Sequence, residues 1–163
     1  MRFNPPVEDG EKQCTKKLVA TASCTGVIQH PALPEYSGAK SAVVGFVRAV
    51  APVLKEKEGI SVSAVCPGLA PTAVLPPWVI ETVGEELLTP IEEVVRLYEM
   101  YLGAEGMEYS GHVGLVMGRD GVEEVPGVKL RTEKEREVYG AVMEPVFGAL
   151  HGVESGLDTG GWF

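Results

Sequence analysis

Three apolar runs separated by amphipathic or proline-rich stretches set the hydropathy pattern of the chain. The first, Lys17 to Ser23, is short and mostly apolar, as a buried strand is. The second, Ile60 to Cys66, alternates small polar with apolar residues and is rich in β-branched side chains, which predicts a strand that ends at Pro67-Gly68. The third, Gly111 to Gly118, predicts another strand.

A long helix is predicted between the first two runs, over residues 35–57. Its apolar residues recur at steps of three and four and form one stripe: Ala39, Val43, Phe46, Val47, Val50 and Leu54. Pro52 lies inside this span and is expected to kink the last turn or to end the helix early, because proline removes a backbone donor. Gly59 supplies the stop.

Further helices are predicted on either side of the third strand. Residues 69–89 are rich in proline and predict a loop that carries one short helix. Thr89-Pro90 then opens a helix that runs to about Leu102, with Thr89 as the capping residue and acidic side chains in the first turn. A short helix is expected over 133–148, followed by a frayed glycine-rich end over 156–163.

This order of elements predicts an α/β protein. Strands that alternate with helices favour a small parallel sheet of about three strands with flanking helices and right-handed crossovers. We expect residues 1–16 to form a flexible polar leader, residues 17–125 to form the folded domain, and residues 126–163 to form a partly helical extension.

Composition and charge argue against several classes of function. The 163 residues carry a net charge of −9, with no cluster of lysine and arginine, which argues against nucleic acid as a partner. The sequence predicts neither a membrane span of ~20 apolar residues nor a signal peptide, so we expect a cytoplasmic protein. Three cysteines, Cys14, Cys24 and Cys66, read as reduced thiols, and the scattered histidines give no support for a metal site.

Ser23, Tyr36 and Lys40 are the candidate catalytic residues. Tyr36 and Lys40 are four residues apart, so on a helix they share one face. A phenol has a pKa of about 10, and an ammonium group one turn away is expected to lower it. A serine hydroxyl from the strand end would hold a carbonyl or alcohol oxygen near the phenol, an arrangement that suits reversible carbonyl reduction. The tyrosine–lysine spacing alone is common on helices and is weak evidence.

The stretch from Leu18 to Thr72 resembles the C-terminal half of the short-chain dehydrogenase/reductase family. The matching features, all in register, are Ser23, Thr25-Gly26, Tyr36-Ser37-Gly38-Ala39-Lys40, Gly45-Phe46, Cys66-Pro67-Gly68 and Thr72. The segment Ala32 to Tyr36 looks most like members related to 15-hydroxyprostaglandin dehydrogenase. The resemblance implies a partial Rossmann-like three-layer fold and hydride transfer between NAD or NADP and a secondary alcohol or ketone.

The resemblance also implies a role for each site residue. Tyr36 would be the acid/base, Lys40 would lower its pKa and bind the nicotinamide ribose, and Ser23 would position the substrate oxygen. Pro67, Gly68 and Thr72 resemble the loop that closes on the nicotinamide and the diphosphate. Residues 73–89 stand where the family has its variable substrate cover, and Trp78 would make that cover apolar or would be a hydrophobic cap with no ligand.

The family's glycine-rich turn for the cofactor diphosphate has no counterpart in this sequence, nor has its catalytic asparagine, since the one asparagine is Asn4. We therefore expect NAD or NADP to bind weakly. Two readings stay open: a shortened dehydrogenase/reductase, or a degenerate member that acts as a binding protein without catalysis of its own. A cofactor-free isomerase or cyclase is a third. The expected partners are a small, apolar substrate and a second copy of the chain, through helix 35–57.

Overall fold

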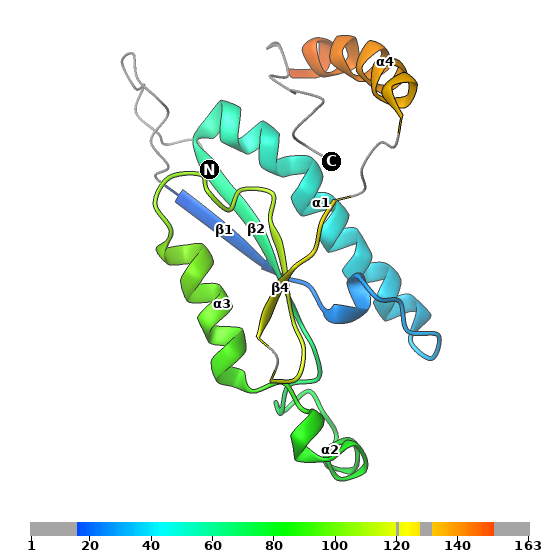
Figure 1. Cartoon of the computed structure of the whole chain (residues 1–163), viewed down its shortest axis with the longest axis vertical. Helices are drawn as coiled ribbons and strands as arrows, with labels where there is room; N and C mark the ends of the chain where they lie inside the picture. Colours follow the sequence, from blue (N-terminus) through cyan, green and yellow to red (C-terminus); the bar gives the residue numbers. More distant parts are fainter. Residues whose placement is uncertain (1–15, 120, 128–131, 152–163) are drawn as a thin grey trace. The chain divides into compact units, whose positions relative to one another are not determined.

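The computed structural model describes residues 16–119, 121–127 and 132–151 of the chain. The chain divides into two compact units, residues 1–125 and residues 126–163, which we describe separately. The first unit contains a four-stranded sheet with helices on its two faces (Figure 1).

The sheet has the strand order β1-β2-β3-β4, with β1 at Lys16–Thr21, β2 at Ile60–Pro67, β3 at Val113–Val116 and β4 at Val122–Glu124. β1 pairs in parallel with β2, and β2 in parallel with β3, which confirms the α/β fold and the parallel core of the sheet. The fourth strand was not predicted. β4 is three residues long and antiparallel to β3, and each of its residues is exposed, so it lacks the run of apolar residues that marks a buried strand.

Helix α1, Pro34–Glu58, is one residue longer at each end than predicted. Of the two effects expected of Pro52, a kink or an early end, the early end is wrong, because the helix continues through this residue. Ala51 is fully buried and Pro52 is buried as well, and this packing holds the turn despite the missing donor. Gly59 ends the helix with a left-handed backbone, φ 62°, as predicted.

By length and composition α1 is also able to cross a membrane, contrary to the sequence-based expectation that no such segment exists. This is weak evidence, because core helices of globular domains pass the same test. In the structure α1 covers one face of the sheet, where Val44, Val47 and Ala51 are buried.

The proline-rich stretch after β2 carries the short helix α2, Pro77–Val83, and one 3-10 turn, Glu85–Leu87, in agreement with the prediction. Helix α3, Ile91–Gly103, follows. Its N-terminal residue is flanked by Pro90, and no side chain caps it, so the assignment of Thr89 as the cap is wrong. The Thr89 hydroxyl accepts a hydrogen bond from the Gly118 amide instead, at 3.0 Å.

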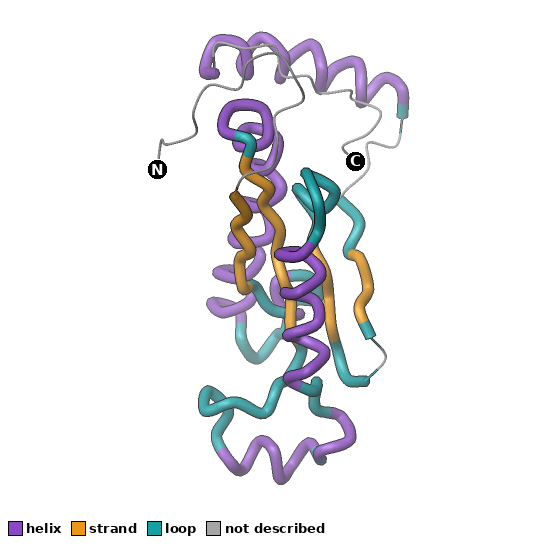
Figure 2. The backbone as a smooth tube through the Cα atoms, turned by 90° about the vertical axis from the view of Figure 1, so that its left-hand side faces the viewer, coloured by secondary structure: helices purple, strands orange, loops and turns teal. Residues whose placement is uncertain are grey.

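The core lies on both faces of the sheet and produces three layers. On the face covered by α1, a cluster joins Val47, Ala51 and other α1 residues to Val62, Ala64, Cys66 and Leu115 of the sheet. On the other face, Leu97 and Tyr101 of α3 pack against Val65 and Val116. Figure 2 shows α1 and α3 on opposite sides of the strands.

The second unit contains helix α4, Glu133–His151, which confirms the helix predicted over 133–148 and extends it by three residues. The expected leader and the expected frayed end lie outside the described residues, apart from Lys16, which belongs to β1.

Candidate functional site

The candidate site lies at the carboxyl ends of β1 and β2. Because these strands are parallel, the segments that follow them emerge at the same edge of the sheet. Ser23 comes two residues after β1, and Pro67-Gly68 stands where β2 ends. Ligands of open α/β sheets bind in the crevice outside the carboxyl ends of the strands.

Ser23 does not end the strand as predicted. β1 stops at Thr21, and Ser23 instead caps the 3-10 turn η1, Cys24–Gly26. Its hydroxyl oxygen accepts hydrogen bonds from the Thr25 amide, at 3.3 Å, and the Thr25 hydroxyl, at 3.1 Å. Serine is a common capping residue because its hydroxyl oxygen accepts a hydrogen bond from a first-turn backbone amide that has no partner within the helix. These two bonds fix the position of the hydroxyl at the end of β1.

Tyr36 and Lys40 lie one turn apart near the start of α1, as their spacing predicted. The Lys40 Nζ is 5.6 Å from the centre of the Tyr36 ring and donates a hydrogen bond to the main-chain carbonyl of Thr21, at 3.1 Å. The Tyr36 side chain is 46% exposed, so a ligand can reach the phenol.

Gly26 brings the Ser23 turn against α1. A Cβ atom on Gly26 would lie 2.8 Å from the main-chain carbon and oxygen of Lys40, so only glycine allows this approach. The Ser41 hydroxyl also donates to the Gly26 carbonyl, at 3.0 Å. Sequence reasoning singled out Thr25-Gly26 as part of a family pattern but assigned no task to Gly26, Ser41 or Thr21. The lack of space that makes Gly26 necessary is not visible in a sequence.

Pro67, Gly68 and Thr72 lie along the neighbouring loop. The Gly68 amide donates to the Val116 carbonyl at 2.7 Å, so the loop leaves β2 beside the end of β3. Thr72 is exposed and lies in a turn where the Leu75 amide donates to its carbonyl, at 3.0 Å. These contacts join Ser23, Tyr36 and Lys40 through η1 and Thr21. Gly68 directly follows β2, the neighbouring strand.

The segment expected to cover the substrate, residues 73–89, exposes three large apolar side chains, whereas Leu88 is buried. Val74 is 87% exposed, Trp78 on α2 is 65% exposed and Leu87 is 64% exposed. Both interpretations of Trp78, an apolar cover and a cap with no ligand, therefore stay predictions.

Two free thiols border the site. Cys24 is half-buried and Cys66 is fully buried, and neither forms a disulfide with a described residue, whereas Cys14 lies outside the described residues. Burial raises the pKa of the Cys66 thiol to about 11, and a hydrogen bond with the Ser23 backbone opposes this rise. No group of metal-ligating side chains occurs within residues 16–119, 121–127 and 132–151.

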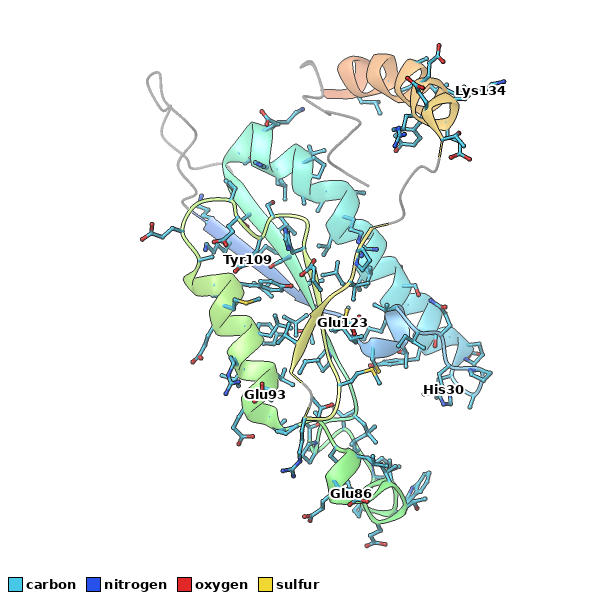
Figure 3. The ribbon with its side chains drawn as sticks, viewed as in Figure 1. His30, Glu86, Glu93, Tyr109, Glu123 and Lys134 are labelled. Carbon is cyan, nitrogen blue, oxygen red and sulfur yellow. The ribbon has the colours of Figure 1, made fainter. Side chains whose placement is uncertain are left out.

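A second cluster of ionisable side chains lies at the opposite end of β3, where the strand begins. The Tyr109 ring, labelled in Figure 3, lies 5.3 Å from the Tyr101 ring and 5.4 Å from the His112 ring. Glu124 accepts hydrogen bonds from the Val113 amide, at 3.1 Å, and from the Tyr101 hydroxyl, at 3.4 Å. Burial, and then the Glu124 carboxylate, raise the pKa of Tyr101 above its usual range. These contacts fasten β4 and α3 to β3.

The family model and the sequence relatives that match this chain are all dehydrogenases or reductases of the short-chain type or proteins named as dehydrogenases. The family model for short chain dehydrogenases matches residues 11–80. The chain is 35% identical, over 96% of its length, to short-chain dehydrogenase/reductase prx6 of Penicillium rubens, of which it covers 50%. It is 45% identical, over 40% of its length, to a 2,5-dichloro-2,5-cyclohexadiene-1,4-diol dehydrogenase of Sphingobium indicum, of which it covers 26%.

Two solved structures have a fold similar to that of this chain. A 3-hydroxyacyl-CoA dehydrogenase type-2 from Mycobacterium avium is 25% identical, with a TM-score of 0.55 over 69% of this chain and 44% of that one. The fold also matches ElxO with NADP bound, with a TM-score of 0.52, 24% identity and coverage of 61% of this chain and 44% of that one. The chain spans about half the length, or less, of the relatives it matches. In its fold, its sequence relatives and its family-model match, the chain is similar to the short-chain dehydrogenase/reductase family.

Proposed function

We propose that the protein acts in hydride transfer between NAD or NADP and a secondary alcohol or ketone of small, apolar character. The observation that carries this proposal is the position of the Lys40 ammonium, between the Tyr36 ring and the end of β1. The Lys40 ammonium and the Tyr36 phenol therefore lie close together, where the turn that Ser23 caps packs against α1.

In the proposed reaction each group has one task. The Ser23 hydroxyl holds the substrate oxygen. The Tyr36 phenol gives a proton to that oxygen when a ketone is reduced and takes it back when an alcohol is oxidised. Lys40 places a positive charge beside the phenol, with its Nζ 5.6 Å from the centre of the Tyr36 ring.

The chemistry of the donors fits the nicotinamide end of the cofactor, which supplies or accepts the hydride when bound. An ammonium group has three protons, and the Thr21 carbonyl accepts one, which leaves two for ribose hydroxyls. Gly68 and Thr72 follow the neighbouring strand and would face the same ligand. No glycine-rich turn for a diphosphate occurs in the 163-residue sequence, so we expect this chain to hold the cofactor weakly.

The apolar character of the substrate is inferred from the exposed side chains of Val74, Trp78 and Leu87, which would be buried when a ligand binds. The diol named for the Sphingobium indicum relative is a secondary alcohol, in line with the proposed class.

A second candidate function, binding without catalysis, is favoured by the outer face of α1. Phe46 is 63% exposed there, and Ala39, Ala42, Gly45 and Ala49 are exposed around it. We propose that a second copy of the chain covers this face.

The test is titration of the purified chain with NADH and NADPH, followed by nicotinamide fluorescence, with an assay of secondary alcohols and NAD or NADP. The proposal expects weak binding and a slow reaction whose rate Tyr36→Phe lowers by about 10²–10⁴-fold. Binding without any reaction, or a reaction that survives Tyr36→Phe, would count against catalysis by Tyr36. Binding without reaction, together with dimers that Phe46→Glu dissociates, would favour the second candidate.

A further inference from the structure

Thr21 links the two helical layers at the point where Lys40 is held. Its main-chain carbonyl accepts a hydrogen bond from Lys40 of α1, at 3.1 Å. Its hydroxyl lies 2.5 Å from the hydroxyl of Tyr98, which belongs to α3 on the other face of the sheet. One residue at the end of β1 therefore contacts both layers.

Among the strands that the structure describes, β1 is an edge strand, and the Thr21 carbonyl lies on the side of β1 that faces away from β2. β1 is the first strand in the sheet order, and the next residue, Ala22, directs its amide to β2, donating to the Val65 carbonyl at 2.8 Å. Successive residues of a strand direct their backbone groups to opposite sides, so Thr21 directs its carbonyl away from β2. A ladder bond to β2 therefore does not set the direction of this carbonyl.

The side chain of Thr21 supplies that constraint. Val19, two residues earlier on the same face, packs against Leu97 and Tyr101 of α3, and Tyr98 is partly buried in the same cluster. A tyrosine ring held by this packing offers a hydroxyl in a fixed place. The bond between the two hydroxyls restrains Thr21, and with it the carbonyl that Lys40 needs.

We infer that Tyr98 and Thr21 are positioning residues for the Lys40 ammonium. A free lysine side chain samples many rotamers, so an acceptor in a fixed place decides where its charge stands. The α3 layer, which carries none of the catalytic candidates, thereby controls where the charge beside Tyr36 lies. The catalytic meaning of this control rests on the proposed function, whereas the contact itself does not.

The test measures the accessibility of one amine and requires no turnover. The full chain is labelled with a trace of acetic anhydride, whose acetyl group forms an amide with the amine while acetate leaves, and the rate at each lysine is read by peptide mass spectrometry. Tyr98→Phe removes only the hydroxyl. We expect it to raise the acetylation rate of Lys40 by about two- to tenfold, the size of one hydrogen bond. Lys55 and Lys57, at the far end of α1, are internal references and should not change.

Two variants of Thr21 separate positioning from general loosening. Thr21→Val keeps the shape and the carbonyl but loses the hydroxyl, and should match Tyr98→Phe, with no further rise in the double variant. Thr21→Ser restores the hydroxyl and should restore the slow labelling. The inference is overturned if Lys40 is labelled at one rate in all variants, or if Lys55 and Lys57 speed up in parallel. If Lys40 alone responds while the unmodified chain oxidises no alcohol, the positioning role stands and the proposed function fails.

Discussion

The hydroxyl of Thr89 accepts a hydrogen bond from the backbone amide of Gly118, at 3.0 Å, and so joins the start of α3 to the end of β3. Thr89 is fully buried, and its own amide donates to the Leu69 carbonyl at 2.8 Å. The two bonds fix both ends of the segment that contains Thr72, α2 and Trp78. A side chain that fits the pattern of a helix cap thus serves to anchor this loop.

Replacement of Thr89 by valine should destabilise the protein by about 1–3 kcal/mol, because the Gly118 amide loses its partner. Urea unfolding would measure the change. Thr82→Val is the matched control, since the Thr82 hydroxyl is exposed on α2 and donates only to the Trp78 carbonyl; its effect should stay within about 0.5 kcal/mol. Equal losses for the two variants would refute the anchoring role of Thr89.

Gly68→Ala should also be destabilising, by about 1–3 kcal/mol, because there is no space for a methyl group. A Cβ on Gly68 would lie 2.6 Å from the Thr89 Oγ1 and 3.2 Å from the Met117 Cγ. Gly45→Ala is the control on the exposed side of α1. Nothing lies within 4 Å of its Cβ, and alanine favours a helix, so this variant should be more stable by up to about 1 kcal/mol. Thermal unfolding of the two variants should shift in opposite directions.

The parts of the fold that could be predicted from the sequence are those set by local apolar periodicity. The stripe of Val43, Val47 and Val50 gives α1, and the β-branched run of residues 60–66 gives β2, because burial on one face or on both leaves a regular pattern. β4 could not be predicted, since Val122–Glu124 carries no such pattern and is held by Glu124 through its contacts with Val113 and Tyr101.

For the candidate site, the residue types and their spacing predicted which turn carries Tyr36 and Lys40, but not what holds them. The roles of Gly26, Thr21 and Tyr98 depend on contacts between residues far apart in the chain, up to 77 positions for Thr21 and Tyr98. Pro52 shows the reverse case, because tertiary packing overrides a local rule that is clear in the sequence.

Alkaline pH should lower the free energy of unfolding, in part through ionisation of the Cys66 thiol. Burial raises the pKa of this thiol from its ordinary value of 9.0 to about 11, so the folded state favours the neutral thiol. A group with this shift contributes stability that is present below pH 9 and is lost as pH rises from about 9 through 11, roughly 2–3 kcal/mol in all. Cys66→Ala removes the ionisable group. The difference in unfolding free energy between the natural chain and this variant should therefore shrink from pH 7 to pH 11, and a constant difference would contradict the assignment.

Tyr36→Phe should lower any cofactor-dependent oxidation of secondary alcohols by about 10²–10⁴-fold, because the variant loses the proposed proton-transfer group alone. The ring stays, so the contact with the Lys40 ammonium and the fold are expected to stay as well. Since Tyr36 is 46% exposed, and its hydroxyl forms no hydrogen bond with another residue in the described part of the chain, thermal stability should change by less than about 0.5 kcal/mol. Steady-state rates with the nicotinamide absorbance as readout give the first quantity, and thermal unfolding gives the second. Tyr139→Phe, on α4 in the second unit, is the matched tyrosine control and should leave the rate unchanged. An equal loss of rate in both variants would place the cause outside the Tyr36 hydroxyl.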